Sequence, residues 1–167
     1  MIMLTVGTTS FPFKRLLRAV DQTLVNSESK EKLIAQIGTS DYRFDYKNTQ
    51  IFSELSFGKI LDYLTRARLV IAHGGAGTVF LALKYAKNKP LIVPRSRREG
   101  EHVDDHQIFF TKYMAKKNLI KVVYPDEDLL EKIRDFIERS EKNIYNEKKS
   151  SRRRLVERLT EYTEGFK

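Results

Sequence analysis

Short apolar runs of the β type alternate with amphipathic stretches along this chain, and this alternation restricts the fold more than any other feature. The β-type runs cover residues 2–6, 33–37, 69–72, 91–93 and 120–123. Between them, apolar residues recur every three or four positions, as in a helix with one buried face. Strands that alternate with helices form a parallel sheet covered on both faces. The sequence therefore predicts a single α/β domain over residues 1–167, with a Rossmann-like parallel sheet flanked by helices.

Helices are expected between the strands and after the last one. They are predicted at residues 13–24, 57–64, 79–85, 102–116 and from 126 onward. Residues 44–52 are interpreted as a loop with a short third strand. A basic amphipathic segment ends the chain, and we expect residues 150–167 to form a C-terminal helix with Leu155 and Leu159 on one face.

The stretch HGGAGT, which ends at Thr78, interrupts an otherwise apolar region. A strand is expected to end at His73 and a helix to begin near Gly77 or Thr78. No Gly-Lys-Ser/Thr follows, so this is not a P-loop, and Phe80 stands where a dinucleotide fingerprint needs its third glycine. Two interpretations remain. The loop is a nest for phosphate at a helix N-terminus, with His73 and the Thr78 hydroxyl as added donors, or a tight turn that packs a helix close to the sheet.

A second chemistry-bearing stretch is GEHVDDHQ, which ends at Gln107. His102 and His106 are four residues apart and are expected to share one face of a helix, a spacing that can hold a metal. Asp104 and Asp105 could supply oxygen ligands. Two other interpretations are an exposed helix start with an aspartate cap, and a set of groups that recognise sugar hydroxyls.

The glycine-bearing loops all follow predicted strands. They begin at Gly7, Gly38 and Gly74, and the charged loop RSRREGE begins at Arg95. Ligands of open parallel sheets bind beyond the carboxyl ends of the strands, so these loops are expected on one edge. RSRREGE is expected to be a solvated loop, with a place beside an anionic ligand as the alternative.

The chain is basic, with 31 Lys and Arg against 22 Asp and Glu and a formal net charge of +9. This charge suits nucleic acid, an anionic membrane surface or a phosphate-bearing substrate. Nucleic acid is not the expected partner, because aromatic residues are not interleaved with the basic clusters. The absence of cysteine excludes disulfides and thiolate metal sites.

No apolar run approaches the roughly 18 residues that span a bilayer. The N-terminus looks like a first strand, and a cytoplasmic location is expected.

HGGAGT, followed by ALKYAKNKPLIVPR and GEHVDDHQ, resembles the C-terminal, donor-binding domain of glycosyltransferase family 28. More narrowly, it looks like the small catalytic subunits of bacterial exopolysaccharide and capsule glycosyltransferases. Those are similar to the eukaryotic subunit that adds the second N-acetylglucosamine to a dolichol-linked sugar. VGTTSFPFKRLLRAVD looks like the family's opening strand, loop and helix. The resemblance implies a fold equivalent to the C-terminal half of a GT-B glycosyltransferase.

The resemblance also implies an activity and partners. The chain would be the catalytic, donor-binding subunit of an inverting UDP-sugar hexosyltransferase. It would work with a membrane-associated acceptor-binding subunit, which recruits it to the inner face of the cell membrane, and extend a polyprenyl-diphosphate-linked sugar. By its residues, the basic C-terminal helix is a surface helix that returns to the core, or one that contacts a partner or an anionic membrane surface.

Matching positions carry the family's roles onto this sequence. The donor diphosphate would be bound by His73, Gly74, Gly75, Gly77 and Thr78. The cleft would be lined by Gly7 and Thr8. The sugar would be bound by Glu101, Asp104, Asp105, His106 and Gln107. The general base is expected in the partner, with His102, Asp105 and His106 as candidates in this chain. Leu81 stands where related domains often place a glutamate that holds the ribose.

No obligatory metal or other cofactor is expected. Fixed N–H donors and a helix dipole can stabilise the charge on the leaving diphosphate, as a divalent metal does elsewhere. Two alternatives differ in class. One is a nucleotide-sugar-binding regulatory module without transfer activity. The other is a metal-dependent hydrolase built on His102, Asp104, Asp105 and His106.

Overall fold

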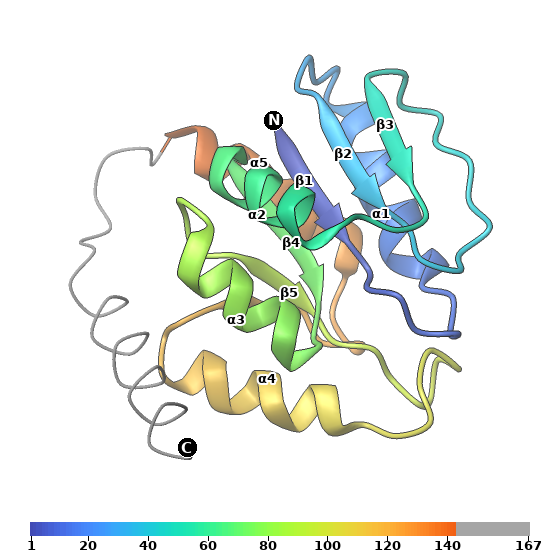
Figure 1. The fold of residues 1–167 in the computed structure, drawn as a ribbon, viewed down its shortest axis with the longest axis vertical. Coiled ribbons are helices and arrows are strands. Elements are labelled where there is room, and N and C mark those ends of the chain that lie inside the picture. The colour runs from blue at the N-terminus through green and yellow to red at the C-terminus, as the bar shows by residue number, and fades with distance from the viewer. Residues whose placement is uncertain (143–167) are drawn as a thin grey trace.

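The computed structural model describes residues 1–142, which form a six-stranded parallel sheet and five helices (Figure 1). The strands are β1 (Ile2–Thr5), β2 (Leu33–Gln36), β3 (Thr49–Phe52), β4 (Leu69–His73), β5 (Leu91–Val93) and β6 (Lys121–Val122). The helices are α1 (Lys14–Asn26), α2 (Phe57–Arg66), α3 (Ala76–Tyr85), α4 (His106–Lys116) and α5 (Leu129–Lys142). The predicted α/β class is confirmed. The helix predicted at residues 150–167 lies outside the described residues.

The sheet has the order β3-β2-β1-β4-β5-β6, and every neighbouring pair is parallel. The chain builds outward from β1 to β3 and then returns to add β4 on the other side of β1. In β1, Ile2 lies opposite both Leu33 and Leu69. The order therefore reverses between β1 and β4, where open α/β sheets form their ligand crevice.

Side chains of β1 and of Val6, the residue after it, alternate between two separate cores. Ile2, Leu4 and Val6 pack with the apolar faces of α1 and α5 on one side of the sheet. Met3 points to the other side and joins apolar residues of α2, α3 and α4. Figure 1 shows the same two helical layers. No helix in the described residues is long and apolar enough to cross a membrane.

One predicted helix boundary is wrong by four residues. The helix expected at residues 102–116 begins only at His106, and the residues just before it form bends. Two hydrogen bonds hold this segment in a loop: the Glu101 N–H donates to the Ser96 carbonyl (3.0 Å), and the Arg97 N–H donates to Asp105 Oδ1 (2.8 Å). Tertiary contacts thus override the local helical pattern.

Candidate functional site

The loops after β1, β2 and β4 meet at the carboxyl edge of the sheet, as predicted. Gly7 has a φ of +75°, which favours glycine, and a Cβ on Gly38 would lie 2.5 Å from the Gly7 carbonyl oxygen. Thr39 Oγ1 donates a hydrogen bond to the Thr9 carbonyl (3.0 Å). A Cβ on Gly7 would lie 2.8 Å from the His73 ring, so the β1 and β4 loops are also in contact.

The three glycines of the β4–α3 loop have different environments. A Cβ on Gly75, the N-cap of α3, would overlap the His73 ring. A Cβ on Gly74 would lie 3.1 Å from Gln107. Gly77 is exposed, and a Cβ there would meet no described atom within 4 Å. Close packing therefore explains Gly74 and Gly75, whereas Gly77 is left without a packing reason.

His73 is a neutral side chain under this loop. It is 6% exposed, and its Nδ1 has no hydrogen-bond partner among the described residues. Burial, and then the positive charge of Arg95, lower the pKa of His73 to about 4. At neutral pH the ring carries no charge. His73 could therefore donate one N–H hydrogen bond to a bound anion, but it would not contribute a positive charge.

A cavity of about 140 Å³ lies between β1, β2, α2 and α3. Its lining includes Gly7, Thr8 and Thr78, three residues that the resemblance assigns to the cleft or to the diphosphate site. Thr5 and Gln36, which are hydrogen-bonded to each other, add polar groups. The remaining lining is apolar and consists of Met3, Ile60, Leu64 and Leu81. The cavity is therefore mainly apolar, with polar groups near the first strand and the glycine loop.

Arg95 is a buried residue that joins several loops by hydrogen bonds, and the sequence analysis did not predict this role. It is 1% exposed, and its guanidinium donates to the carbonyls of Val6 (2.8 Å), Phe11 (2.8 Å) and Glu101 (3.2 Å). It also lies over the Phe13 ring, 4.6 Å from the centroid. The prediction of a solvated loop is wrong for this residue. An arginine two residues after a buried strand was the available signal.

Glu101 and Gln107, both predicted to bind sugar, are buried and hold loops together. Glu101 accepts two hydrogen bonds from Arg15 (2.8 and 2.9 Å) and one from the Ser96 N–H (3.2 Å). Gln107 Oε1 accepts from the N–H groups of Gly74 and Arg95, both at 3.1 Å. Gln107 therefore joins the ends of β4 and β5, which leaves its amide nitrogen as the group to offer a ligand.

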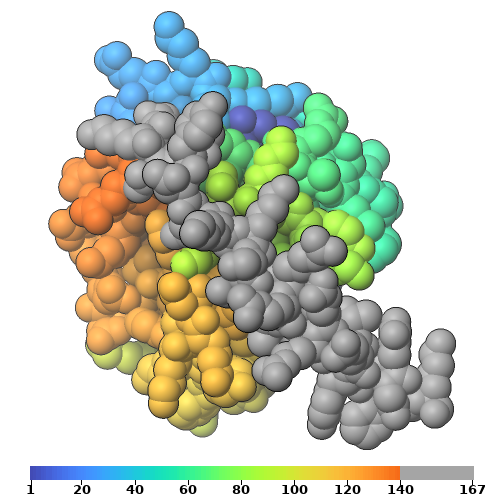
Figure 2. All heavy atoms as spheres, turned by 90° about the vertical axis from the view of Figure 1, so that its left-hand side faces the viewer, coloured from blue at the N-terminus to red at the C-terminus, as the bar shows by residue number. Residues whose placement is uncertain are grey.

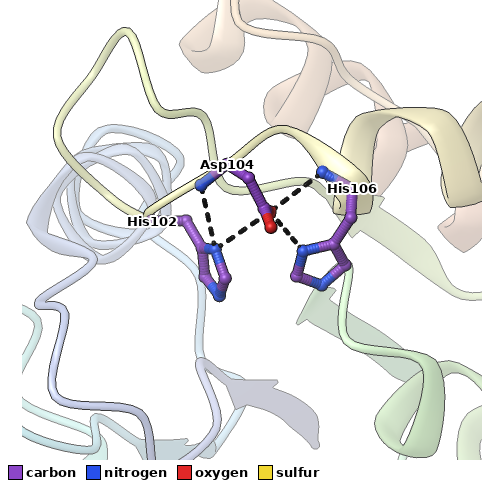
Figure 3. Close-up of side chains that lie close together, drawn as sticks. All are labelled: His102, Asp104 and His106. Carbon is purple, nitrogen blue, oxygen red and sulfur yellow. Dashed lines mark hydrogen bonds and ion pairs between the residues drawn. The ribbon is translucent and has the colours of Figure 1, made fainter.

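His102, Asp104 and His106 point toward one another at the start of α4 (Figure 3). His102 Nδ1 lies 3.3 Å from Asp104 Oδ1, and His106 Nδ1 contacts the same oxygen. The hydrogen bond from His106 is the first cause that lowers the pKa of Asp104. The expected shared helical face is wrong, because His102 precedes the helix, but the loop still brings the two rings together.

This cluster could hold a metal ion, since its three ligand atoms lie within 4.8 Å of one another. Asp105 is not part of it, because its carboxylate accepts from Arg97. Asp105 is the N-cap residue of α4 without a side-chain cap bond, whereas Asp104 Oδ1 accepts the His106 N–H (3.1 Å). The aspartate cap considered from the sequence is therefore formed by Asp104, one residue before the N-cap.

Two solved structures with a similar fold are glycosyltransferases. CalG4, the calicheamicin glycosyltransferase, matches over 93% of this chain and 36% of its own, with a TM-score of 0.67 and 18% identity. MurG of Acinetobacter baumannii matches over 95% of this chain and 49% of its own, with a TM-score of 0.59 and 19% identity. The chain thus spans between a third and half of these proteins. None of the curated proteins matches it.

The parallel sheet and its helical layers match the fold of the C-terminal half of a GT-B glycosyltransferase. The model of the glycosyltransferase family 28 C-terminal domain matches residues 1–159, and the chain belongs to this family.

Proposed function

We propose that this chain is the donor-binding, catalytic subunit of an inverting UDP-sugar hexosyltransferase. The observation that carries the proposal is the open Gly77 in the first turn of α3, beside a cavity lined by Gly7, Thr8 and Thr78. Family membership makes the same edge of the sheet the expected donor site.

The diphosphate of the donor would lie on the N-terminus of α3. Free N–H groups in the first turn and the positive end of the helix dipole attract a dianionic group there. Gly77 leaves the approach open, and Thr78 lines the cavity beside it. Gly74, Gly75 and His73 would contribute indirectly, because their contacts hold the loop in this conformation.

The nucleoside would enter the cavity. Its apolar wall at Ile60, Leu64 and Leu81 suits the faces of a base and a ribose, while Thr5 and Gln36 offer polar atoms. Leu81 cannot accept a hydrogen bond from a ribose hydroxyl as a glutamate would. The ribose would therefore depend on groups such as Thr8 and Thr78 in this protein.

The sugar would face the start of α4. Asp104, His106 and the amide nitrogen of Gln107 can bind its hydroxyls, with Asp105 beside them, while Glu101 and Arg95 keep this loop in place. An acceptor hydroxyl would attack the anomeric carbon as the bond to the diphosphate breaks. UDP would leave, and a base, expected on the acceptor-binding subunit, would take the hydroxyl proton. The N–H donors at α3 stabilise the charge that grows on the departing diphosphate, so no obligatory metal is proposed.

The acceptor we propose is a polyprenyl-diphosphate-linked sugar of exopolysaccharide or capsule synthesis. A membrane-associated subunit would bind it and recruit this chain to the inner face of the cell membrane. The charge of +9 supports this assignment, because both the acceptor and the membrane surface are anionic.

Transfer into lipid tests the proposal. The purified chain would be mixed with solubilised membranes of its source and with radiolabelled UDP-glucose, UDP-galactose, UDP-glucuronic acid or UDP-N-acetylglucosamine. We expect label from one donor in the lipid extract, and a loss of at least tenfold in Gly77→Val. Gly58→Val is the matched control, because Gly58 is also the second residue of a helix with open space around it. The proposal fails if no donor labels lipid, or if both variants behave alike.

A metal-dependent hydrolase is the second candidate, and the convergence of His102, Asp104 and His106 favours it. Metal analysis and hydrolysis assays of phosphoesters with added Zn²⁺ or Mn²⁺ distinguish the two. Stoichiometric tightly bound metal together with hydrolysis that is lost in His106→Asn would support the hydrolase. The hydrolase would be ruled out if the purified protein contains no metal and hydrolyses none of these esters with added Zn²⁺ or Mn²⁺.

A further inference from the structure

The outward side of α4 exposes two aromatic side chains. Phe109 is 71% exposed and Tyr113 is 61% exposed, and they lie one helical turn apart. The buried residues of α4 are Gln107, Thr111 and Met114, on the opposite side of the helix. The aromatic pair therefore points away from the protein's own core.

Lysines flank these aromatic residues. Lys112, Lys116 and Lys117 are exposed on the same helix and at its end, and Lys117 Nζ lies 5.8 Å from the Tyr113 ring centroid. From α3, Phe80 is 40% exposed and packs edge-on against Phe110, with ring centroids 5.8 Å apart. We call this surface the α4 face; it consists of Phe80, Phe109, Lys112, Tyr113, Lys116 and Lys117. Figure 2 shows α4, coloured gold, at the surface of the molecule.

Acidic residues are absent from both segments that build the α4 face. The sequence contains no Asp or Glu between residues 74 and 98, or between 106 and 125. Three carboxylates on other elements have partners: Asp62 pairs with Arg66, Asp104 contacts His106, and Glu127 accepts the Tyr124 N–H (2.7 Å). The charged side chains of the α4 face itself are all lysines, so the face is basic around its aromatic centre.

Exposed aromatic residues surrounded by lysines help to decide whether the α4 face binds a protein or a lipid surface. Cores of protein–protein interfaces are depleted in lysine, whereas lysines around aromatic residues are typical of surfaces that rest on anionic lipid. Aromatic rings settle at the level of the headgroups, and each nearby lysine is attracted by the negative leaflet. The chemistry of the α4 face fits a bilayer better than it fits another protein.

We propose that the α4 face binds directly to the surface of an anionic membrane, with Phe109 and Tyr113 entering the headgroup layer. This contact is separate from the donor site and from recruitment by a partner subunit. With α4 lying in the membrane plane, the loop at its N-terminus stays near the lipid surface. Under the proposed function, this is where a lipid-linked acceptor would be presented.

A single tryptophan tests the depth of Phe109. The chain contains no Trp, so Phe109→Trp gives a reporter whose emission comes from this position alone. We expect a blue shift with vesicles of phosphatidylcholine and 30% phosphatidylglycerol, and none with phosphatidylcholine alone. Phe57→Trp is the control, because Phe57 is similarly exposed but lies on α2. The absence of a shift at 109, or an equal shift at 57, overturns the proposal.

Charge reversal tests the lysines against the remaining basic surface. Lys112→Glu/Lys116→Glu/Lys117→Glu should sediment with the anionic vesicles at least tenfold more weakly than the unmodified chain. The matched control Lys14→Glu/Lys47→Glu/Lys132→Glu changes the net charge equally, at exposed lysines outside the α4 face. If both triple variants lose binding equally, total charge explains it and the α4 face does not bind lipid. Neither test uses nucleotide binding, so failure of this proposal leaves the donor-site proposal unaffected.

Discussion

Gly75 and Gly77 are two residues apart, yet the structure gives their hydrogens different neighbours. Gly75 lies against the His73 ring, whereas Gly77 faces open space. The sequence offered two interpretations of this loop, a phosphate nest and a close-packed turn. The packing explains Gly74 and Gly75, and the phosphate interpretation is needed only for Gly77.

Alanine substitution should separate these two glycines. Gly75→Ala forces the buried His73 ring to shift, so the free energy of unfolding should fall by about 1–3 kcal/mol. Gly77→Ala adds a better helix former in open space and should raise it by about 0.5–1 kcal/mol. Urea unfolding of both variants measures the difference. Equal stabilities would show that the His73 contact does not constrain the loop.

His73 should make stability depend on pH between about 4 and 6.5. Its pKa is lowered to about 4 in the folded protein, from 6.5, so the unfolded chain binds more protons in this range. The stability is complete above pH 6.5 and is lost as the pH falls toward 4. Between pH 7 and 4.5 the unmodified chain should lose about 2 kcal/mol more than His73→Gln. Parallel pH profiles of the two proteins in urea unfolding would contradict the buried neutral ring.

At the scale of elements, hydrophobic periodicity was a good guide wherever a segment packs mainly through apolar contacts. The helix after Pro12 and the strands at residues 33–37 and 69–72 were predicted within a few residues because their burial pattern is local. The start of α4 was not, because Glu101 and Asp105 are held by Arg15 and Arg97. Such polar ties join residues far apart in sequence, and no periodic pattern records them.

Arg95 makes several such long-range hydrogen bonds, and its replacement should lower the free energy of unfolding. Arg95→Met leaves the carbonyls of Val6, Phe11 and Glu101 without this donor inside the protein. We expect the free energy of unfolding to fall by about 2–4 kcal/mol. Arg97→Met is the control, since Arg97 is exposed, and should change stability by less than about 0.5 kcal/mol. Equal urea midpoints for the two variants would contradict the role assigned to Arg95.

At the scale of the molecule, the sequence predicted the parallel sheet, its two helical layers and the edge where the loops gather. It also placed Gly7, Thr8 and Thr78 together, and all three line one cavity. It did not predict that Glu101 and the Gln107 oxygen are engaged inside the protein, because those bonds depend on how β4, β5 and α1 are arranged. The strand order that sets this arrangement is a property of the whole sheet.

The central claim is that the carboxyl edge at α3 holds the diphosphate of a nucleotide sugar without a metal. Calorimetric titration of the purified chain with UDP, with and without EDTA, tests it most directly. We predict binding that EDTA does not change, that weakens at least tenfold in Gly77→Val, and that persists in Gly58→Val. Binding that EDTA abolishes, or that Gly77→Val and Gly58→Val affect equally, would contradict the claim.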